Sequence, residues 1–453
     1  MKKKYWVLIG ALGILAACSM GGCKKNGTEQ PAQPAQTAQT DSKAASEAQT
    51  DNGEEQITLN FPHWFFSHGE ALSEWINPAI EEFERENPNI KINGYAIGYN
   101  EFWDKLDTSI ASNDAPDIFA LTNTNLSKYV EADTVLALDD YIDMEDIRTN
   151  YSPIQTEDVI KCGKEGKTYC VITDMGFYLP MYRPSLLEKA GLSEYAKTPE
   201  EFIEMAKKFS ALDNVNGYAS MINPGNWSEG SIDLSIWIIG LGGHYGKDGK
   251  PALNSPEVIQ AVTYLKELYD ANVLVKETDK GTYRKMFATG NVGTLIDGQF
   301  LYSMACGWDP SLAEDYEVAD LPFPTQHCSA FFEGLSVSKS SKHPAEAAKF
   351  IEFLCSKEQQ QKLVEITGFG TARNDIFADE TFSRQIYEKW PWMEKYAEHQ
   401  NAAVMNNPEG IGGSLLPEVQ KILYTAYERI LYENADITDT LNAAQEEAML
   451  LFE

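Results

Sequence analysis

The chain has 453 residues, enough for two or more lobes, and its 43% hydrophobic content is typical of a soluble globular protein. Its formal net charge of -31 argues against nucleic acid and anionic lipid surfaces as partners, because both are polyanions. Aromatic residues are plentiful, with nine Trp, 22 Tyr and 20 Phe. Most of these belong in a core, but flat rings also stack on the C–H faces of sugars.

The N-terminus has the pattern of an export signal. Three lysines at residues 2–4 precede an apolar segment at residues 5–15, which is too short to span a bilayer, and small residues then lead into Cys18. The run Leu-Ala-Ala-Cys resembles a bacterial lipobox. We therefore predict that residues 1–17 are a lipoprotein signal peptide and that lipidated Cys18 anchors the protein to the extracytoplasmic side of a membrane. Ordinary secretion is the alternative, and Cys23 is a second lipidation candidate with a poorer match.

Residues 18–55 are mainly Ala, Gln, Thr, Pro, Ser and Asp, and they include almost no large apolar side chains. Such a segment cannot bury enough apolar surface to fold. We predict a disordered tether that holds the folded body off the membrane.

Five cysteines remain after Cys23, and the export signal implies a compartment that permits disulfides. Cys162 and Cys170 flank Gly-Lys-Glu-Gly, which reads as a hairpin turn, so the two thiols should lie within disulfide reach across antiparallel strands. We predict a Cys162–Cys170 bridge. Cys306–Cys328 is a guess that leaves Cys355 unpaired. The cysteines show no metal-ligand spacing, and we expect no metal and no cofactor.

Strand and helix patterns alternate at the start of the folded body. Strands are predicted at 57–61, 90–97 and 115–120, with helices at 70–87 and 99–111 between them. This order indicates βαβ units and a largely parallel sheet in an α/β fold. Pro after Thr198 marks a strong helix start. Later helices are expected at 184–190, 198–211, 232–241, 254–271, 344–354, 358–367, 416–432 and 438–451, and later strands at 179–182, 316–319 and 334–338.

Residues 282–300 read as a helix, a strand and a turn. Tyr283, Met286 and Phe287 share one helical face, and the apolar run 292–296 is rich enough in β-formers for a buried strand. Asp297-Gly298 then reads as a tight turn. Ligands of α/β sheets sit at the carboxyl ends of strands, so this corner is a plausible place to hold a ligand.

Several segments, taken in order, resemble a known family. They are MYRPSLLEKAGL, TPEEFIEMAKKFSA, GLGGHYGKDGKPALNSPEVIQAVTYLKELYD, FATGNVGTLIDGQF and EGLSVSKSSKHPAEAAKFIEFLCSKEQQ. Together with the lipobox they are similar to the extracellular solute-binding proteins of ABC importers, in the group that includes maltose-binding protein and other sugar binders. The resemblance covers residues 57–451. It departs from the family at Arg183, which replaces Asn, and at Gln299 and Phe300, which replace Pro and Trp.

The resemblance implies a two-lobed periplasmic-binding-protein-like fold of type II, with central mixed sheets flanked by helices. Lobe one would comprise residues 57–175 and 327–357, and lobe two residues 176–326 and 358–453. Crossing strands would join the lobes, the ligand would bind in the cleft between them, and hinge closure would trap it.

A sugar site needs flat aromatic rings and planar polar groups that meet hydroxyls. The candidates in segments expected to face the cleft are Trp64, Asn123, Asp174, Tyr178, Trp227, Trp237, Asp297, Phe300, Glu333 and Arg373, with Thr122 and Tyr424 behind them.

Several candidates have ordinary structural alternatives. Trp64 could equally be a packing residue, and Trp237, within an apolar helix, is better explained as core. Helix capping is the stronger explanation of Asp297, and a surface salt bridge explains Arg373 at least as well. Glu333 ranks high because a buried carboxylate is costly without a partner.

The function implied is a sugar or oligosaccharide receptor, working as a monomer that delivers its solute to ABC permease subunits. The same fold with a polyamine, polyol phosphate or peptide as solute is the alternative. Clustered carboxylates around aromatics would suit a polyamine. A secreted glycosidase is the third possibility, since two carboxylates across a bond cannot be recognised from sequence. No G-x-S-x-G, H-E-x-x-H or P-loop motif occurs, and we expect no enzyme.

Overall fold

The computed structural model describes residues 56–66, 71–408 and 410–453. The chain divides into residues 1–53 and a compact unit of residues 54–453, and every described residue belongs to the second. The predicted signal peptide, the lipidation candidates Cys18 and Cys23, and the predicted tether lie outside the described residues. Within the described ranges, none of the helices is both long and apolar enough to cross a membrane.

The first sheet is a parallel pair. Ile57 pairs with Ile90, and the register continues to His63 opposite Ala96, as the predicted βαβ unit requires. A second sheet is mixed, and a short antiparallel ribbon stands apart. The strands are β1 (Ile57–His63), β2 (Ile90–Ala96), β3 (Ile118–Thr122), β4 (Val171–Tyr182), β5 (Asn216–Ala219), β6 (Gly246–Lys247), β7 (Lys250–Pro251), β8 (Val292–Gly298), β9 (Glu317–Val318), β10 (Cys328–Val337) and β11 (Ala403–Met405).

The second sheet is organised around the long strands β4 and β10. Its order is β11-β10-β4-β8-β5, with β3 beside β10 and β9 beside β4. Residues 171–177 of β4 pair antiparallel with β10, and residues 178–182 pair antiparallel with β8. One continuous strand therefore passes from the sheet region of β3 and β10 to that of β8 and β5. Strands β4 and β10 correspond to the crossing strands that the family resemblance implies.

Helices flank both sheet regions, and several begin with the predicted caps. The Thr198 hydroxyl accepts from the Glu201 amide at 3.2 Å, with Pro199 at the first helical position. The α-helices are α1 (Ala71–Glu86), α2 (Tyr99–Ala111), α3 (Leu126–Glu131), α4 (Met144–Asn150), α5 (Val159–Lys161), α6 (Pro184–Lys189), α7 (Pro199–Ser210), α8 (Trp227–Gly240), α9 (Pro256–Asp270), α10 (Lys280–Ala288), α11 (Leu301–Trp308), α12 (Pro344–Leu354), α13 (Lys357–Thr367), α14 (Glu380–Lys389), α15 (Met393–His399), α16 (Leu415–Tyr432) and α17 (Ile437–Met449).

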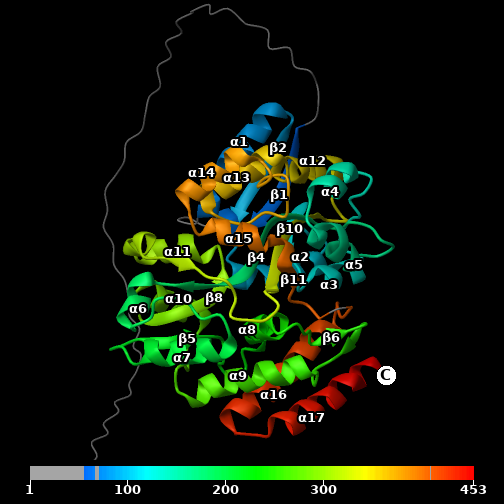
Figure 1. Cartoon of the computed structure of the whole chain (residues 1–453). Helices are drawn as coiled ribbons and strands as arrows, with labels where there is room; N and C mark the ends of the chain where they lie inside the picture. The colour runs from blue at the N-terminus through cyan, green and yellow to red at the C-terminus, as the bar shows by residue number, and fades with distance from the viewer. Residues whose placement is uncertain (1–55, 67–70, 409) are drawn as a thin grey trace, which may run out of the picture. The chain divides into compact units, whose positions relative to one another are not determined.

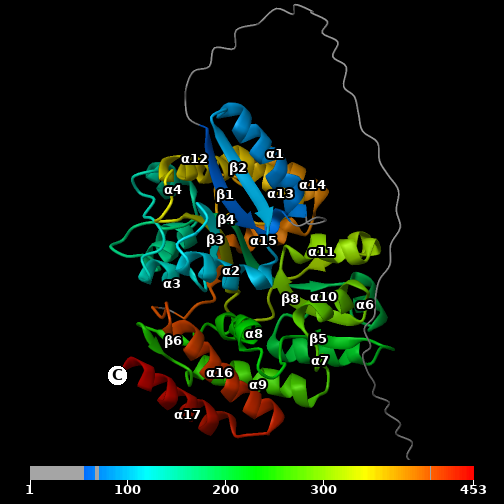
Figure 2. The same ribbon diagram turned by 180° about the vertical axis from the view of Figure 1, so that it is seen from behind.

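The helices form two groups, one on each side of β4 and β10. Figure 1 shows α1, α12 and α13 with β1 and β2 at one end, and α7, α9, α16 and α17 with β5 at the other. The reverse view shows the same separation (Figure 2). Each group has its own buried apolar side chains, for example Trp75 and Phe83 in one and Phe202 and Trp237 in the other.

The packing of α13 differs from our expectation. We assigned residues 358–453 to lobe two, but α13 packs against α1 of lobe one. The Trp75 indole donates to the Gln359 carbonyl at 3.1 Å, and the Lys362 ammonium pairs with Glu82 at 2.8 Å. The third crossing between the lobes therefore comes after α13, and not at residue 357 as we expected. Sequence periodicity could show that this helix exists but not which lobe its apolar face covers.

The predicted disulfides are wrong in this structure, where all five described cysteines carry free thiols. The expected hairpin is also absent. Residues 159–161 are helical, and the turn after them folds back on this helix, with the Gly163 amide donating to the Ile160 carbonyl at 3.0 Å. Cys162 therefore ends a helical turn instead of facing Cys170 across a ladder.

The segment 282–300 forms the predicted helix and strand, with two changes. Helix α10 begins earlier, at Lys280, because the Asp279 carboxylate caps the Thr282 amide at 2.9 Å. Strand β8 extends through Gly298, so Asp297 lies within a strand and not in a turn. Asp297 is also not the cap of the following helix, because α11 has no side-chain cap.

Candidate functional site

Two carboxylates face each other where the strands cross. Asp174 of β4 and Glu333 of β10 are partners in the antiparallel register. The Trp64 indole N–H donates to Glu333 Oε2 at 3.2 Å, which brings the residue after β1 to the same place. Asp174 is only 4% exposed, and its Oδ1 has no hydrogen-bond partner among the described residues. Burial raises the pKa of Glu333 to about 8, and burial together with the charge of Glu333 raises the pKa of Asp174.

Aromatic rings continue the site from Trp64 onto α2. The Trp64 ring centroid lies 5.0 Å from that of Tyr99 and 5.8 Å from that of Trp103. Sequence reasoning missed Tyr99 and Trp103, although a signal was present. The strands β1 and β2 are parallel, so Tyr99 follows the end of β2 just as Trp64 follows the end of β1.

A second aromatic group includes Phe331 of β10 and Tyr178 of β4, the strands that also carry the two carboxylates. The Phe331 ring is 5.4 Å from Tyr178 and 5.7 Å from Phe300, centroid to centroid. Glycines make room for these rings. A Cβ on Gly176 would stand 2.5 Å from Phe331, and one on Gly298 would stand 2.4 Å from Phe300. We refer to Trp64, Tyr99, Asp174, Tyr178, Phe300, Phe331 and Glu333 as the crossing site.

Charged residues of the crossing strands and of two helices, α8 and α10, shift the pKa of the Tyr99 hydroxyl. The Tyr99 side chain is 48% exposed, yet desolvation by the surrounding protein raises the pKa of its hydroxyl. The carboxylates of Glu333, Glu229 and Asp174 raise this pKa further, while Arg284 lowers it. Glu229 lies on α8 and Arg284 on α10, so charges from the far group of helices act on a ring of α2.

Asp297 serves as the partner of Arg284, a residue that sequence reasoning missed. The guanidinium binds both carboxylate oxygens, at 2.7 and 2.8 Å, and Asp297 is 1% exposed. Burial alone would raise the pKa of Asp297, but the charges of Arg284 and Lys280 outweigh it and lower the pKa. The Arg284 guanidinium lies 4.9 Å from the centre of the Phe300 ring. Asp297 thus acts by placing Arg284 on Phe300.

Gln299, one departure from the family pattern, forms hydrogen bonds with the backbone of β4 where this strand passes from β10 to β8. Its amide nitrogen donates to the Met175 carbonyl and its oxygen accepts from the Phe177 amide, both at 3.3 Å. These are the residues at which β4 passes from β10 to β8. Gln299 is 3% exposed, so water cannot easily replace it.

We expect Gln299→Ala to lower the free energy of unfolding by about 1–3 kcal/mol, because it leaves buried backbone groups without partners. Urea denaturation measures this change. Gln260→Ala is the matched control, since Gln260 is exposed and bonds only the neighbouring Tyr264 hydroxyl at 3.4 Å. A loss no larger than that of the control would show that Gln299 does not fasten the crossing.

Two predicted ligand residues are bound by protein partners instead. The Asn123 amide nitrogen donates to Asn406 and Asn407 at 2.7 and 2.8 Å, so this side chain ties β3 to the segment after β11. Arg373 is 4% exposed and pairs with Asp146 and Asp375, each at under 3 Å. Its role is structural and buried, so neither the ligand role nor the surface salt bridge was correct.

The two predicted lobe-two tryptophans are not in the crossing site. Trp237 is fully buried, and its indole donates to the Tyr218 hydroxyl at 3.3 Å within the core, as the core alternative anticipated. Trp227 is the first residue of α8 and is half-buried against the core, whereas the helix was predicted to begin only at residue 232. The helix begins earlier than its apolar run, which explains the error at Trp227.

Protonation of Glu333 gives the stability a pH dependence whose sign follows from its pKa. The folded-state pKa is about 8, above the unfolded value of 4.5, so the stabilisation is present below pH 4.5 and is lost as pH rises through 8. Glu333→Gln cannot ionise. We expect its free energy of unfolding, relative to the unchanged protein, to rise between these two pH values. Urea denaturation at a series of pH values measures the difference, and a pH-independent difference would contradict this prediction.

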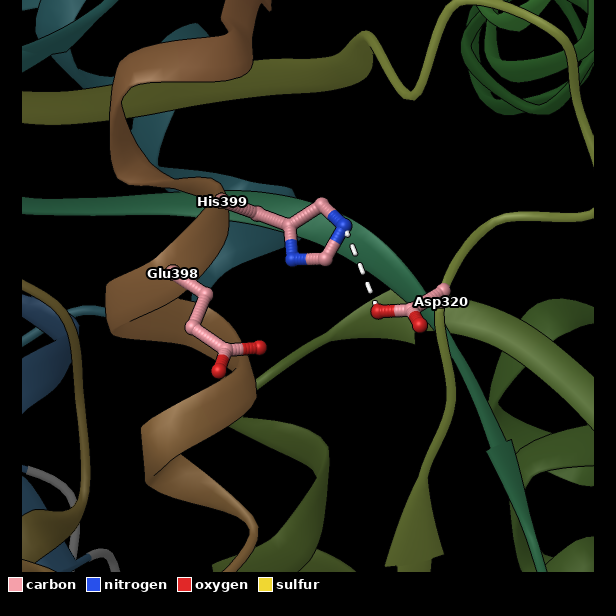
Figure 3. A group of neighbouring side chains, drawn as sticks. All are labelled: Asp320, Glu398 and His399. Carbon is pink, nitrogen blue, oxygen red and sulfur yellow. Dashed lines mark ion pairs between the residues drawn. The ribbon is translucent and has the colours of Figure 1, made fainter.

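A group outside the crossing site could in principle hold a metal. Asp320, Glu398 and His399 place their ligand atoms within 4.8 Å of one another (Figure 3). The Lys395 ammonium, however, lies 3.0 Å from Asp320 and 2.9 Å from Glu398. A lysine cation already serves both exposed carboxylates, so we assign no metal to this group.

Residues 78–393 match the family model of the bacterial extracellular solute-binding proteins. The chain therefore belongs to this family, and the resemblance expected from the motifs is confirmed. The match covers the first parallel pair only in part, but it spans both crossing strands and the whole crossing site beyond Trp64.

Similar proteins include two receptors for oligosaccharides. The diacetylchitobiose-binding protein DasA of Streptomyces coelicolor is 24% identical over 311 residues, which are 66% of this chain and 70% of that protein. The arabinooligosaccharide-binding protein of Bacillus subtilis is 22% identical over 361 residues, 76% and 79% of the two chains. The cyclic α-maltosyl-1,6-maltose-binding protein of Arthrobacter globiformis has a TM-score of 0.74 at 19% identity, covering 86% of this chain and 98% of its own. This likeness confirms the two-lobed fold.

Proposed function

We propose that this protein is the lipid-anchored receptor of an ABC importer and that it captures a sugar or oligosaccharide between its lobes and delivers it to the permease. The observation that carries the proposal is the contact between the Trp64 indole and Glu333 at 3.2 Å, beside the aromatic rings of the crossing site. Flat faces next to carboxyl oxygens provide what a pyranose needs, namely surfaces for its C–H groups and acceptors for its hydroxyls.

Family membership supports a role in binding, and the two oligosaccharide receptors support carbohydrate as the solute class. The crossing strands β4 and β10 suit a hinge, because β4 pairs first with β10 and then with β8, while β10 packs on α12 of one helix group and on α8 of the other. Closure about them would bring Tyr99 and Arg284 onto opposite sides of a bound sugar. Binding without turnover fits the absence of catalytic motifs in the sequence.

The proposed anchor rests on the sequence. Leu-Ala-Ala before Cys18 supports lipidation there, and residues 18–55 would give the receptor reach from the membrane to the permease. Metabolic labelling with a radioactive fatty acid tests the anchor. Label in the unchanged chain and none in Cys18→Ala is expected, and label that persists in Cys18→Ala would place the lipid elsewhere.

A thermal-shift screen tests the solute class. A ligand that binds only the folded form raises Tm by mass action, by an amount worth about 2.7 kcal/mol at a hundredfold excess over Kd. Malto-, chito- and arabino-oligosaccharides, polyols and polyamines would be compared at equal concentration. We expect at least one carbohydrate to raise Tm, and a shift with none of the carbohydrates would contradict the proposal.

A further inference from the structure

The carboxylates of the crossing site lack the basic partners that their neighbours have. Arg284 binds Asp297 through Nε and Nη2, and Lys280 pairs with Asp233. Among the described residues, no ion pair involves either of these two carboxylates. The neutral donors to this pair among the described residues are the Trp64 indole, on Glu333, and the Thr173 hydroxyl, on Asp174.

Asp174 indicates a missing ligand group. Its carboxyl is more than nine-tenths buried, and Oδ1 has no hydrogen-bond partner among the described residues. Its register partner Glu333 is half-buried and reaches the Trp64 indole, so the pair opens toward the rings of Trp64 and Tyr99. A buried carboxylate without a partner is costly, which means that a bound cation or proton must satisfy it.

The surroundings also suit a positive charge. Aromatic rings lie beside the pair, and aromatic faces attract cations. The Trp64 indole reaches Glu333, the Tyr99 ring lies 5.0 Å from Trp64, and Phe331 belongs to the same strand as Glu333. Glu229 adds a further carboxylate that acts on Tyr99. The net charge of -31 would raise the local concentration of a cationic solute.

We propose that the solute carries a protonated amine, as in an oligosaccharide of glucosamine, and that this ammonium binds between Asp174 and Glu333. The proposal rests on the proposed carbohydrate function and narrows its substrate class. The ammonium N–H groups would donate to Asp174 Oδ1 and to the free oxygen of Glu333, while sugar faces stack on Trp64 and Tyr99. Charge-assisted hydrogen bonds of this kind are stronger than those to a neutral hydroxyl.

Release of a proton on binding would distinguish a bound ammonium from a bound sugar hydroxyl. Near neutral pH the free pair holds a proton, because burial raises the pKa of both carboxyls. An ammonium binds an ionised carboxylate more strongly than a protonated one, so its binding favours release of the proton to the buffer. The other charged groups nearby are Glu229, Arg284, Lys280, Asp233 and Asp297, and the last four are already paired with each other.

The test is isothermal titration of the full chain near pH 6 with glucosamine oligomers and with N-acetylglucosamine oligomers of the same length. We expect the amine form to bind more tightly by about tenfold or more. Titration in buffers of different ionisation enthalpy should show release of roughly one proton per amine ligand and almost none with the acetylated form.

Two variants and a control complete the experiment. Asp174→Asn and Glu333→Gln keep the shape of the site and should each weaken amine binding by about tenfold while changing the acetylated form by about threefold or less. Asp133→Asn removes an exposed charge that pairs with Lys339, and it should leave both affinities unchanged. The affinities of Asp133→Asn therefore show whether loss of any one negative charge weakens binding, or only loss of a charge in the crossing site.

The outcomes distinguish this inference from the proposed function. Equal or tighter binding of the acetylated oligomers, or of any uncharged sugar, would overturn the amine proposal and leave the carbohydrate receptor standing. Binding of spermidine with no binding of any sugar would support the cation site but overturn the carbohydrate function. Amine binding that survives both Asp174→Asn and Glu333→Gln would place the ammonium elsewhere and overturn the proposal.

Discussion

Replacing Arg284 by Met should lower the free energy of unfolding by about 3–5 kcal/mol, because it leaves the Asp297 carboxylate buried without a counter-charge. Asp297 is 1% exposed and receives two guanidinium donors, at 2.7 and 2.8 Å. Burial opposes its ionisation, and the charges of Arg284 and then Lys280 are what lower its pKa. Without Arg284 the carboxyl must either take up a proton or stay charged in an apolar region. Urea denaturation near neutral pH measures the loss.

A double variant tests the cause of this loss. Arg284→Met combined with Asp297→Leu removes both charges and should regain most of the stability, because an apolar pair of similar volume avoids the desolvation penalty. Lys105→Met is the matched surface control. Its ammonium bonds Glu101 at 2.7 Å, but both side chains are more than half exposed, so the change should be within error. A loss of about 1 kcal/mol or less for Arg284→Met would show that solvent reaches Asp297.

Replacing Trp64 by Ala should weaken solute binding by about 30- to 1000-fold, which corresponds to a loss of roughly 2–4 kcal/mol. The substitution removes a stacking face and also the indole donor to Glu333. It further removes the ring contacts of Trp64 with Tyr99 and Trp103, at 5.0 and 5.8 Å, so the aromatic side of the site loses its order. Isothermal titration with the solute found by the thermal-shift screen measures the change.

Two controls separate the parts of this effect. Trp64→Phe keeps a ring but not the donor, and it should lose only about tenfold. Trp308→Ala removes a tryptophan that is 37% exposed at the end of α11 and outside the crossing site, so affinity should stay the same. If Trp64→Ala bound as tightly as the unchanged protein, the solute would not contact the crossing site.

The fold could be predicted because its signals are local. Strands and helices alternate with strong caps, and the order of motifs identified the family. A third crossing was expected at residue 357, but its position after α13 could not be predicted, because the Trp75–Gln359 and Lys362–Glu82 contacts join residues far apart in sequence. The hairpin at Cys162 failed for a related reason. The residues after Cys162 can form a turn between two antiparallel strands or the end of a helix, and in the structure they end a helix.

The candidate site was predictable where a residue follows the end of a strand or lies on a crossing strand. Trp64, Asp174 and Glu333 meet this condition, and they lie together. Asn123 also follows the end of a strand, but its amide bonds Asn406 across 283 residues. Arg373 follows a helix, and it bonds Asp146 across 227 residues. The role of Arg284 could not be predicted, because the sequence of its helix does not show that Asp297 and Phe300 lie next to it.

Departures from the family pattern proved informative about structure. Gln299 in place of Pro supplies the amide that joins the two halves of β4. Arg183 in place of Asn binds Asp315 at 2.8 Å and the Ala288 carbonyl at 2.9 Å, which ties the end of β4 to the segments beside it. Phe300 in place of Trp keeps a ring under the Arg284 guanidinium. Each substituted side chain therefore contacts a neighbouring segment, a consequence that motif comparison alone does not reveal.

Capture of a sugar at the crossing site is tested by isothermal titration of the unchanged protein and of Trp64→Ala with the oligosaccharide that gives the largest thermal shift, followed by chromatography of the sugar after incubation. We expect saturable binding with one solute per chain, weaker binding by Trp64→Ala, and the oligosaccharide recovered intact. No binding of any oligosaccharide, or recovery of cleaved products, would contradict this expectation.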